Sequence, residues 1–128
     1  MKANELRIGN YYYEFMIPKI VDALMFVKLS QIEHANKIAI DVSPIPLTEE
    51  WLLKFGFELK DKVNMGFIKQ INYPHMKNYL YANSKHYTTA LWDESNQIEF
   101  FTSPCQYIHQ LQNLYFALTG GELIECNQ

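Results

Sequence analysis

The segment that decides the fold is SPCQYIHQLQNLYFALTGG, residues 103–121. Its apolar residues recur every three or four positions, which predicts an amphipathic helix with one face toward a core. The core-facing stripe comprises Tyr107, Ile108, Leu111, Leu114, Tyr115 and Leu118. At the start of the helix, Ser103 is the predicted N-cap, Pro104 the first helical residue, and Gln106 completes a capping box. The helix is predicted to end near Thr119, before Gly120 and Gly121.

The middle of the chain predicts a second helix followed by a series of strands. The helix covers Glu49–Phe55, with Thr48 as its N-cap and Gly56 at its end. The extended runs that follow are Phe57–Lys60, Gly66–Asn72, Asn78–Ala82, Tyr87–Trp92 and Gln97–Thr102. The polar residues Asp93–Asn96 separate the last two runs, which indicates a β-hairpin.

The two ends of the chain predict further strands. Residues Leu6–Phe15 are interpreted as extended, with a bend at Gly9 and Asn10. A second extended run, Ile20–Leu29, is expected to form a hairpin with the alternating segment Lys37–Val42. The alternative for Ile20–Leu29 is a helix. Leu123 and Ile124 predict a brief edge strand.

These elements define an α+β fold class. We expect a mainly antiparallel, twisted sheet or a partly open barrel, with the short helix at one edge and the C-terminal amphipathic helix packed on it. The length of 128 residues and a hydrophobic content of 48% favour one core, and therefore a single domain over residues 1–128.

Composition disfavours several classes of ligand and location. The net charge is −3 and Arg7 is the single arginine, so nucleic acid is disfavoured as a partner. The first ten residues lack the apolar region of a secretion signal, and no apolar run approaches the ~20 residues of a membrane span. Two cysteines fit reduced thiols. The expectation is a cytoplasmic protein without a membrane anchor.

No motif in the sequence indicates a catalytic site, a metal site or a cofactor. The glycines do not form GxGxxG, GxxxxGK[ST] or GxSxG. Cys105 and His109 are four residues apart and would share a helix face, but a nucleophile also needs an orienting group and an oxyanion site. The other histidines, His34, His75 and His86, have no ligand at metal-binding spacing. We therefore predict a protein that is not an enzyme, with no cofactor and no metal; a small enzyme that uses Cys105 with His109 is the least favoured alternative.

The nine tyrosines suggest an interaction surface. Tyr11 and Tyr13 share a strand face, and Phe116 lies nearly opposite the apolar stripe of its helix. These three residues form the candidate surface for an unknown protein partner or for self-association. The alternative is an accessory protein that binds nucleic acid through a patch of Lys54, Lys60, Lys62, Lys69 and Lys77 beside Tyr73, Tyr79 and Tyr81.

Three stretches carry a resemblance to a protein family: MKANELRIGNYYY (1–13), PIPLTEEWLLKFGFE (44–58) and YIHQLQNLYFALTGGEL (107–123). Together they resemble a group of small uncharacterised proteins of Bacteroides-type bacteria and their phages or mobile elements. The likeness covers about a third of the chain and brings no catalytic or binding residues with it. It implies a cytoplasmic origin and an accessory role in a phage or mobile element.

Overall fold

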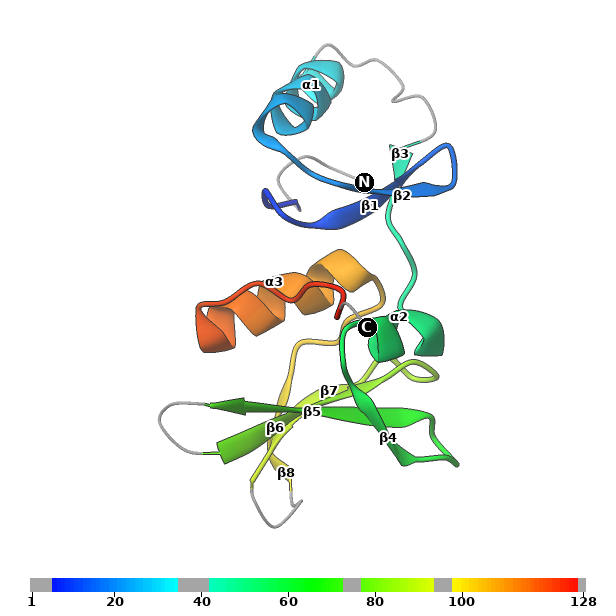
Figure 1. Ribbon diagram of the computed structural model, residues 1–128, viewed down its shortest axis with the longest axis vertical. Helices are drawn as coiled ribbons and strands as arrows, with labels where there is room; N and C mark the ends of the chain where they lie inside the picture. The colour runs from blue at the N-terminus through cyan, green and yellow to red at the C-terminus, as the bar shows by residue number, and fades with distance from the viewer. Residues whose placement is uncertain (1–5, 35–41, 73–76, 94–97, 127–128) are drawn as a thin grey trace. The chain divides into compact units, whose positions relative to one another are not determined.

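The computed structural model describes residues 6–34, 42–72, 77–93 and 98–126 and combines helices with antiparallel strands (Figure 1). The helices are α1 (Ala23–His34), α2 (Glu49–Lys54) and α3 (Ile108–Thr119). The strands are β1 (Tyr11–Glu14), β2 (Ile17–Ile20), β3 (Val42–Ser43), β4 (Glu58–Asp61), β5 (Gly66–Asn72), β6 (Lys77–Asn83), β7 (Thr89–Trp92) and β8 (Ile98–Thr102). The predicted α+β fold class is confirmed.

The strands form two sheets, and each sheet belongs to its own compact unit. The small-sheet unit, Met1–Pro46 with Tyr107–Asn113, contains the order β2-β1-β3. The large-sheet unit, Leu47–Gln106 with Leu114–Gln128, contains the order β4-β5-β6-β7-β8. The boundary runs through α3, so this helix contributes to both units. The expectation of a single domain stays a prediction.

The large sheet buries one of its faces and leaves the other partly exposed. Side chains on the buried face include Phe67, Ile71, Leu80, Leu91 and Thr89. On the opposite face Tyr81 stacks on Trp92, with ring centroids 4.8 Å apart. Gly66 makes room for this pair, because a Cβ there would come within 2.5 Å of the Tyr81 ring. Among the described strands β4 and β8 do not pair, so the sheet is open and does not close into a barrel.

Helix α2 begins at Glu49 as predicted and ends at Lys54, one residue before the predicted Phe55, which is its C-cap. The Thr48 hydroxyl accepts a hydrogen bond from the N–H of Trp51 at 3.3 Å, as an N-cap does. At the other end Gly56 has φ +87°, and the N–H of Phe57 donates to the carbonyl of Leu52 at 3.0 Å. The N–H of Gly56 donates to Leu53, which completes a Schellman motif.

The extended run predicted over Ile20–Leu29 is wrong, because helix α1 occupies most of it. Asp22 caps this helix: its Oδ1 accepts from the N–H of Met25 at 2.7 Å, and its carbonyl accepts from the N–H of Phe26. Met25 and Phe26 then pack against the buried residues Leu6, Tyr12 and Val21. The hairpin predicted with Lys37–Val42 fails with that strand, and residues 37–41 themselves lie outside the described part.

The C-terminal helix ends at Thr119 as predicted but begins at Ile108, not next to Ser103. The N–H of Cys105 donates to the carbonyl of Tyr87, and the carbonyl of Gln106 accepts from Leu47, so this segment is held outside the helix. Its third helical residue is Gln110, whose Oε1 accepts from the Tyr107 N–H at 3.1 Å.

The remaining strand predictions are confirmed within two residues, apart from the two chain ends. Between β7 and β8 the hairpin forms, and of its connection residues 94–97 lie outside the described part. At the N-terminal end β1 begins only at Tyr11, after a turn in which Gly9 has φ +100°. The strand predicted at Leu123 and Ile124 is wrong: the segment is irregular, and Leu123 is buried.

Candidate interaction surfaces

The tip of the β1–β2 hairpin exposes three large apolar side chains. Glu14 pairs with Ile17, so Phe15 and Met16 form a two-residue turn. The exposed fractions are 57% for Phe15, 74% for Met16 and 56% for Ile17. These three residues are called the hairpin tip below. A contiguous apolar group of this kind on a protein surface is a typical contact site for a partner.

The backbone of the hairpin tip is unfavourable for the residues that form it. Phe15 has φ +52° and Met16 has φ +63°, the left-handed region that a type I′ turn requires. Asn-Gly is the preferred pair in such a turn, and a residue with a Cβ loses about 1–2 kcal/mol in this conformation. The tip therefore carries bulky apolar groups at a cost in stability, as functional sites often do.

Strand β2 is an edge of the small sheet, but it is a poor template for a further strand. Tyr13 pairs with Pro18, and proline has no N–H to donate. This position must then be one of the pairs without hydrogen bonds, and the missing donor faces outward from the edge. A partner would contact the hairpin through side chains and not through strand addition.

Two opposite charges flank the tip on one face of the hairpin. The register pairs Glu14 with Ile17 and Tyr12 with Lys19, which places the Glu14 and Lys19 side chains on the same face. The hydroxyl of Tyr12 donates to Glu14 at 3.2 Å. Burial of Tyr12, together with the nearby Glu14 carboxylate, raises the pKa of its hydroxyl to about 12. Tyr12 therefore stays a neutral donor that orients Glu14.

The three residues predicted from sequence as an interaction surface differ in exposure. Tyr11 is buried, Tyr13 is half-buried, and Phe116 is 40% exposed. The backbone N–H of Tyr11 donates to Oε1 of Gln112, a buried polar residue of α3, at 2.8 Å. The interaction surface at these positions stays a prediction. The hairpin tip was missed, although two apolar residues between β-prone runs, without Asn or Gly, were the available signal.

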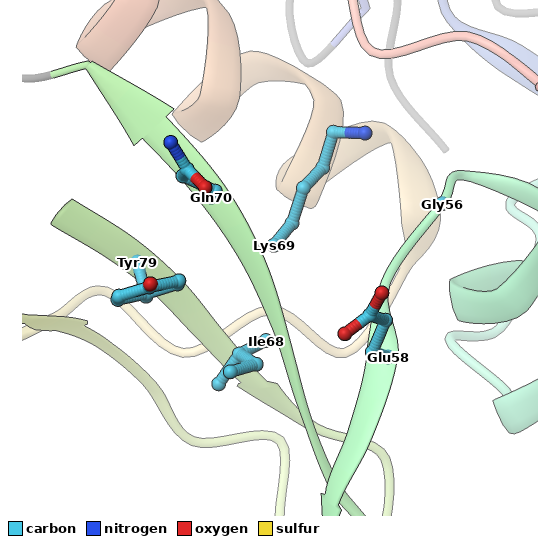
Figure 2. Close-up of a pocket in the computed structure, with 6 residues that line it drawn as sticks. All are labelled: Gly56, Glu58, Ile68, Lys69, Gln70 and Tyr79. Atoms are coloured by element: carbon cyan, nitrogen blue, oxygen red, sulfur yellow. The ribbon is translucent and has the colours of Figure 1, made fainter. Parts of the chain in front are cut away.

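A pocket opens in the large-sheet unit where β4 ends beside β5. Glu58 is the first residue of β4 and pairs with Ile68, whereas β5 continues to Asn72. The resulting hollow of about 370 Å³ is lined by Gly56, Glu58, Ile68, Lys69, Gln70 and Tyr79 (Figure 2). By the strand register, the side chains of Glu58, Ile68, Gln70 and Tyr79 share one face of the sheet, whereas the Lys69 side chain points to the other face.

Cys105 and His109 do not form the predicted pair on one helix face, because Cys105 precedes α3. Its side chain is 2% exposed, and its Sγ lies 3.6 Å from the carbonyl oxygen of Ser103. Burial raises the pKa of the Cys105 thiol to about 12. A thiol that stays protonated at neutral pH is a poor nucleophile.

The lysines of the predicted nucleic-acid patch have different environments. Lys54 pairs with Glu50 at 3.3 Å and lies over the Trp51 ring, and Lys69 donates to the Phe55 carbonyl at 2.9 Å. Lys60 and Lys62 are exposed, whereas Tyr81 is buried and Tyr79 half-buried. Tyr73 lies outside the described residues, and the Lys77 side chain is not described. Nucleic-acid binding stays a prediction.

The histidines are scattered over the described elements. His34 ends α1, His86 is exposed in the turn after β6, and His109 is buried in α3, while His75 lies outside the described part. Over residues 6–34, 42–72, 77–93 and 98–126, no three His, Cys, Asp or Glu side chains gather as a metal site would require. None of the described helices has the length and apolarity needed to cross a bilayer.

Comparison of the chain with protein-family models, with curated proteins and with solved structures finds no match. The resemblance to small proteins of Bacteroides-type bacteria and their phages therefore stays a prediction. The function has to be argued from the two local geometries, the hairpin tip and the pocket.

Proposed function

We propose that the chain is a non-enzymatic protein-interaction module and that its hairpin tip binds a second copy of the chain. The observation that carries this proposal is the combination of exposure and conformation at Phe15 and Met16. Each is more than half exposed, and each has the positive φ that bulky side chains avoid. Burial of such side chains in a partner would recover free energy that the isolated hairpin lacks.

The charges beside the tip favour a second copy as the partner. A two-fold contact brings the same surface of two chains together, so each group meets the group on the other side of the axis. Glu14 and Lys19 are opposite charges on one face of the hairpin, and a two-fold axis through the tip can place each beside the other in the second copy. The apolar residues then meet at the centre and the charges at the rim.

A double variant separates binding from folding. Replacing Phe15 with Asn and Met16 with Gly supplies the pair that a type I′ turn prefers, so the fold should keep or gain stability. The same change removes two apolar contacts and should abolish self-association. Size-exclusion chromatography with light scattering over a range of protein concentrations measures the mass, and urea unfolding measures the stability.

The control is Val63→Asn, which removes an exposed apolar side chain from the β4–β5 connection of the other unit. We expect this variant to associate as the unchanged chain does. The proposal is wrong if the chain without substitutions is monomeric at every concentration. It is also wrong if the double variant keeps the mass of a dimer.

Charge reversal tests the two-fold arrangement itself. Lys19→Glu alone places like charges together and should weaken association several-fold, whereas Glu14→Lys combined with Lys19→Glu should restore it. Failure of the combined variant to restore association would argue against the two-fold axis.

A lipid surface is the competing occupant of an exposed apolar hairpin. Sedimentation with uncharged phosphatidylcholine vesicles distinguishes it from a second copy. If the chain stays monomeric and sediments with vesicles, while the Asn-Gly variant does not, the tip is a membrane contact and the proposal is wrong.

The cytoplasmic setting and the accessory role in a phage or mobile element belong to this proposal through the sequence resemblance alone. A small self-associating protein suits such a role because it supplies a binding surface without chemistry of its own.

A further inference from the structure

Strand β5 continues past the end of β4, so part of its outer edge has no neighbouring strand. Glu58 is the first residue of β4 and pairs with Ile68, whereas β5 runs on to Asn72. The hollow of about 370 Å³ lies at this edge (Figure 2). A strand edge without a neighbour presents main-chain N–H and C=O groups with which another chain can pair.

The hydrogen bonds of β6 show which main-chain groups of β5 face the hollow. In an antiparallel ladder the N–H and C=O of one residue point to the same neighbouring strand, and successive residues alternate between neighbours. The N–H of Asn83 donates to Thr88 at 2.9 Å, so the odd-numbered residues of β6 bond to β7 and its even-numbered residues bond to β5. Leu80 therefore bonds to Lys69, which lies opposite it. The N–H and C=O of Gln70 point the other way, toward the hollow, and no described residue outside the ladder hydrogen-bonds to them.

The face of the sheet at this edge carries one negative charge. The side chains of Glu58, Gln70 and Tyr79 share that face, and all three line the hollow. Lys69 points to the other face, where its Nζ donates to the carbonyl of Phe55 at 2.9 Å. Among the described residues the Glu58 carboxylate forms no ion pair. A ligand on this face would therefore meet a carboxylate that is free to accept hydrogen bonds.

We propose that an extended peptide with a positively charged side chain binds at this edge as an added strand. The peptide residue opposite Gln70 exchanges main-chain hydrogen bonds with it. Its side chain then projects to the same face as Glu58, about 7 Å along the edge. A lysine or arginine side chain spans this distance and donates to the carboxylate. The site lies in the large-sheet unit and does not depend on self-association through the hairpin tip.

The first test titrates short blocked peptides at millimolar concentrations by saturation-transfer NMR. Acetyl-valyl-lysyl-valine amide supplies an extended chain with one central cation. We expect it to bind about fivefold more tightly than the same peptide with a central glutamate. Butylamine carries the cation without the peptide groups and should bind less tightly than the lysine peptide. Equal binding of these two would identify a site for small organic cations and overturn the proposal, as would an absence of peptide binding.

Two N-methylated forms of the lysine peptide test the strand pairing. Methylation at the lysine nitrogen removes the N–H that faces the carbonyl of Gln70 and should weaken binding by about fivefold or more. Methylation at the following valine changes an N–H that points away from β5 and should leave binding close to that of the parent. If both methylated forms bind equally well, the peptide does not lie along the edge as a strand and the proposal fails.

Substitutions at Gln70 make the same test from the side of the protein. Gln70→Pro removes an N–H that the sheet does not use, so the fold should tolerate it while strand addition is lost. Gln70→Thr keeps both main-chain groups and should keep binding. Circular dichroism checks that the variants are folded. A folded proline variant that binds the lysine peptide as tightly as the threonine variant would contradict the proposal, and if the proline variant unfolds, the methylated peptides decide.

Charge reversal at Glu58 assigns the cation of the peptide to its partner. Glu58→Lys should reverse the preference, so that the glutamate peptide binds more tightly than the lysine peptide. Glu49→Lys makes the same change at an exposed residue of α2 outside the hollow and should leave the preference as it is. The same preference in both variants would place the cation elsewhere and count against the proposal.

Discussion

The two cysteines of the chain have opposite environments. Cys105 is 2% exposed and its thiol pKa is raised to about 12 by burial, whereas Cys126 is exposed. Only the thiolate reacts with an alkylating agent. Both access and protonation therefore protect Cys105 in the folded chain.

We predict that iodoacetamide at pH 8 modifies Cys126 and leaves Cys105 almost untouched. A rise from 9.0 to about 12 lowers the thiolate fraction of Cys105 by about a thousandfold, before steric protection is counted. Peptide mapping by mass spectrometry measures both rates, and unfolding in urea should make them similar. Fast modification of Cys105 in the folded chain would instead identify a reactive thiol and revive a catalytic interpretation.

Single residues were predicted from sequence only where their environment is set by their own element. Phe116 is exposed, as its angle on the helix predicts. Tyr11 is buried although it shares a strand face with Tyr13, and its backbone N–H donates to Gln112, about a hundred positions later in the chain. The pocket joins Glu58 to Tyr79 across three strands. Such assemblies depend on register, which sequence spacing does not reveal.

At the scale of elements, Gln112 connects α3 to the start of β1. Its Oε1 accepts from the N–H of Tyr11 at 2.8 Å, and its Nε2 donates to the carbonyl of Gly9 at 3.2 Å. The side chain is fully buried. One side-chain amide thus supplies an acceptor to the N–H of Tyr11 and a donor to the carbonyl of Gly9.

We predict that Gln112→Leu lowers the free energy of unfolding by about 2–5 kcal/mol, although leucine has a similar volume. The loss comes from one buried and one partly buried backbone group that no longer have this partner, at about 1–3 kcal/mol each. Urea unfolding followed by circular dichroism measures it. Gln106→Leu makes the same chemical change at an exposed side chain and should stay within about 0.5 kcal/mol. Similar stability of the two variants would show that the bridge contributes little.

Elements were predicted well where capping residues and alternation agree. Helix α2 has a threonine at its start and a glycine at its end, and both signals work locally. Helix α1 was predicted only as the alternative to a strand, because the alternation of Val21, Ala23 and Met25 favoured an extended run, whereas in the structure Asp22 caps a helix. The start of α3 was misplaced because Gln106 and Gln110 offer the same capping chemistry, and backbone hydrogen bonds from outside the helix select Gln110.

At the scale of the whole molecule, the fold class followed from the pattern of elements, but the two sheets did not. Alternating strands indicate a sheet without stating which strands share it. Both tryptophans, Trp51 and Trp92, lie in the large-sheet unit, while Leu111 belongs to the part of α3 that lies in the small-sheet unit. Tryptophan fluorescence therefore reports on one unit while a substitution acts in the other.

We predict that Leu111→Asp abolishes the cooperative unfolding transition seen by tryptophan fluorescence. Leu111 is fully buried, so the substitution places an unpaired charge in the core. Because α3 contributes residues to both units, we expect the loss of stability in one unit to destabilise the other. Leu24→Asp, at an exposed leucine of α1, makes the same change without burial and should leave the transition in place. If Leu111→Asp lowers the helical circular dichroism but leaves the tryptophan transition unchanged, the units fold independently. The single-domain expectation would then be wrong, because a shared helix without shared stability does not make one cooperative domain.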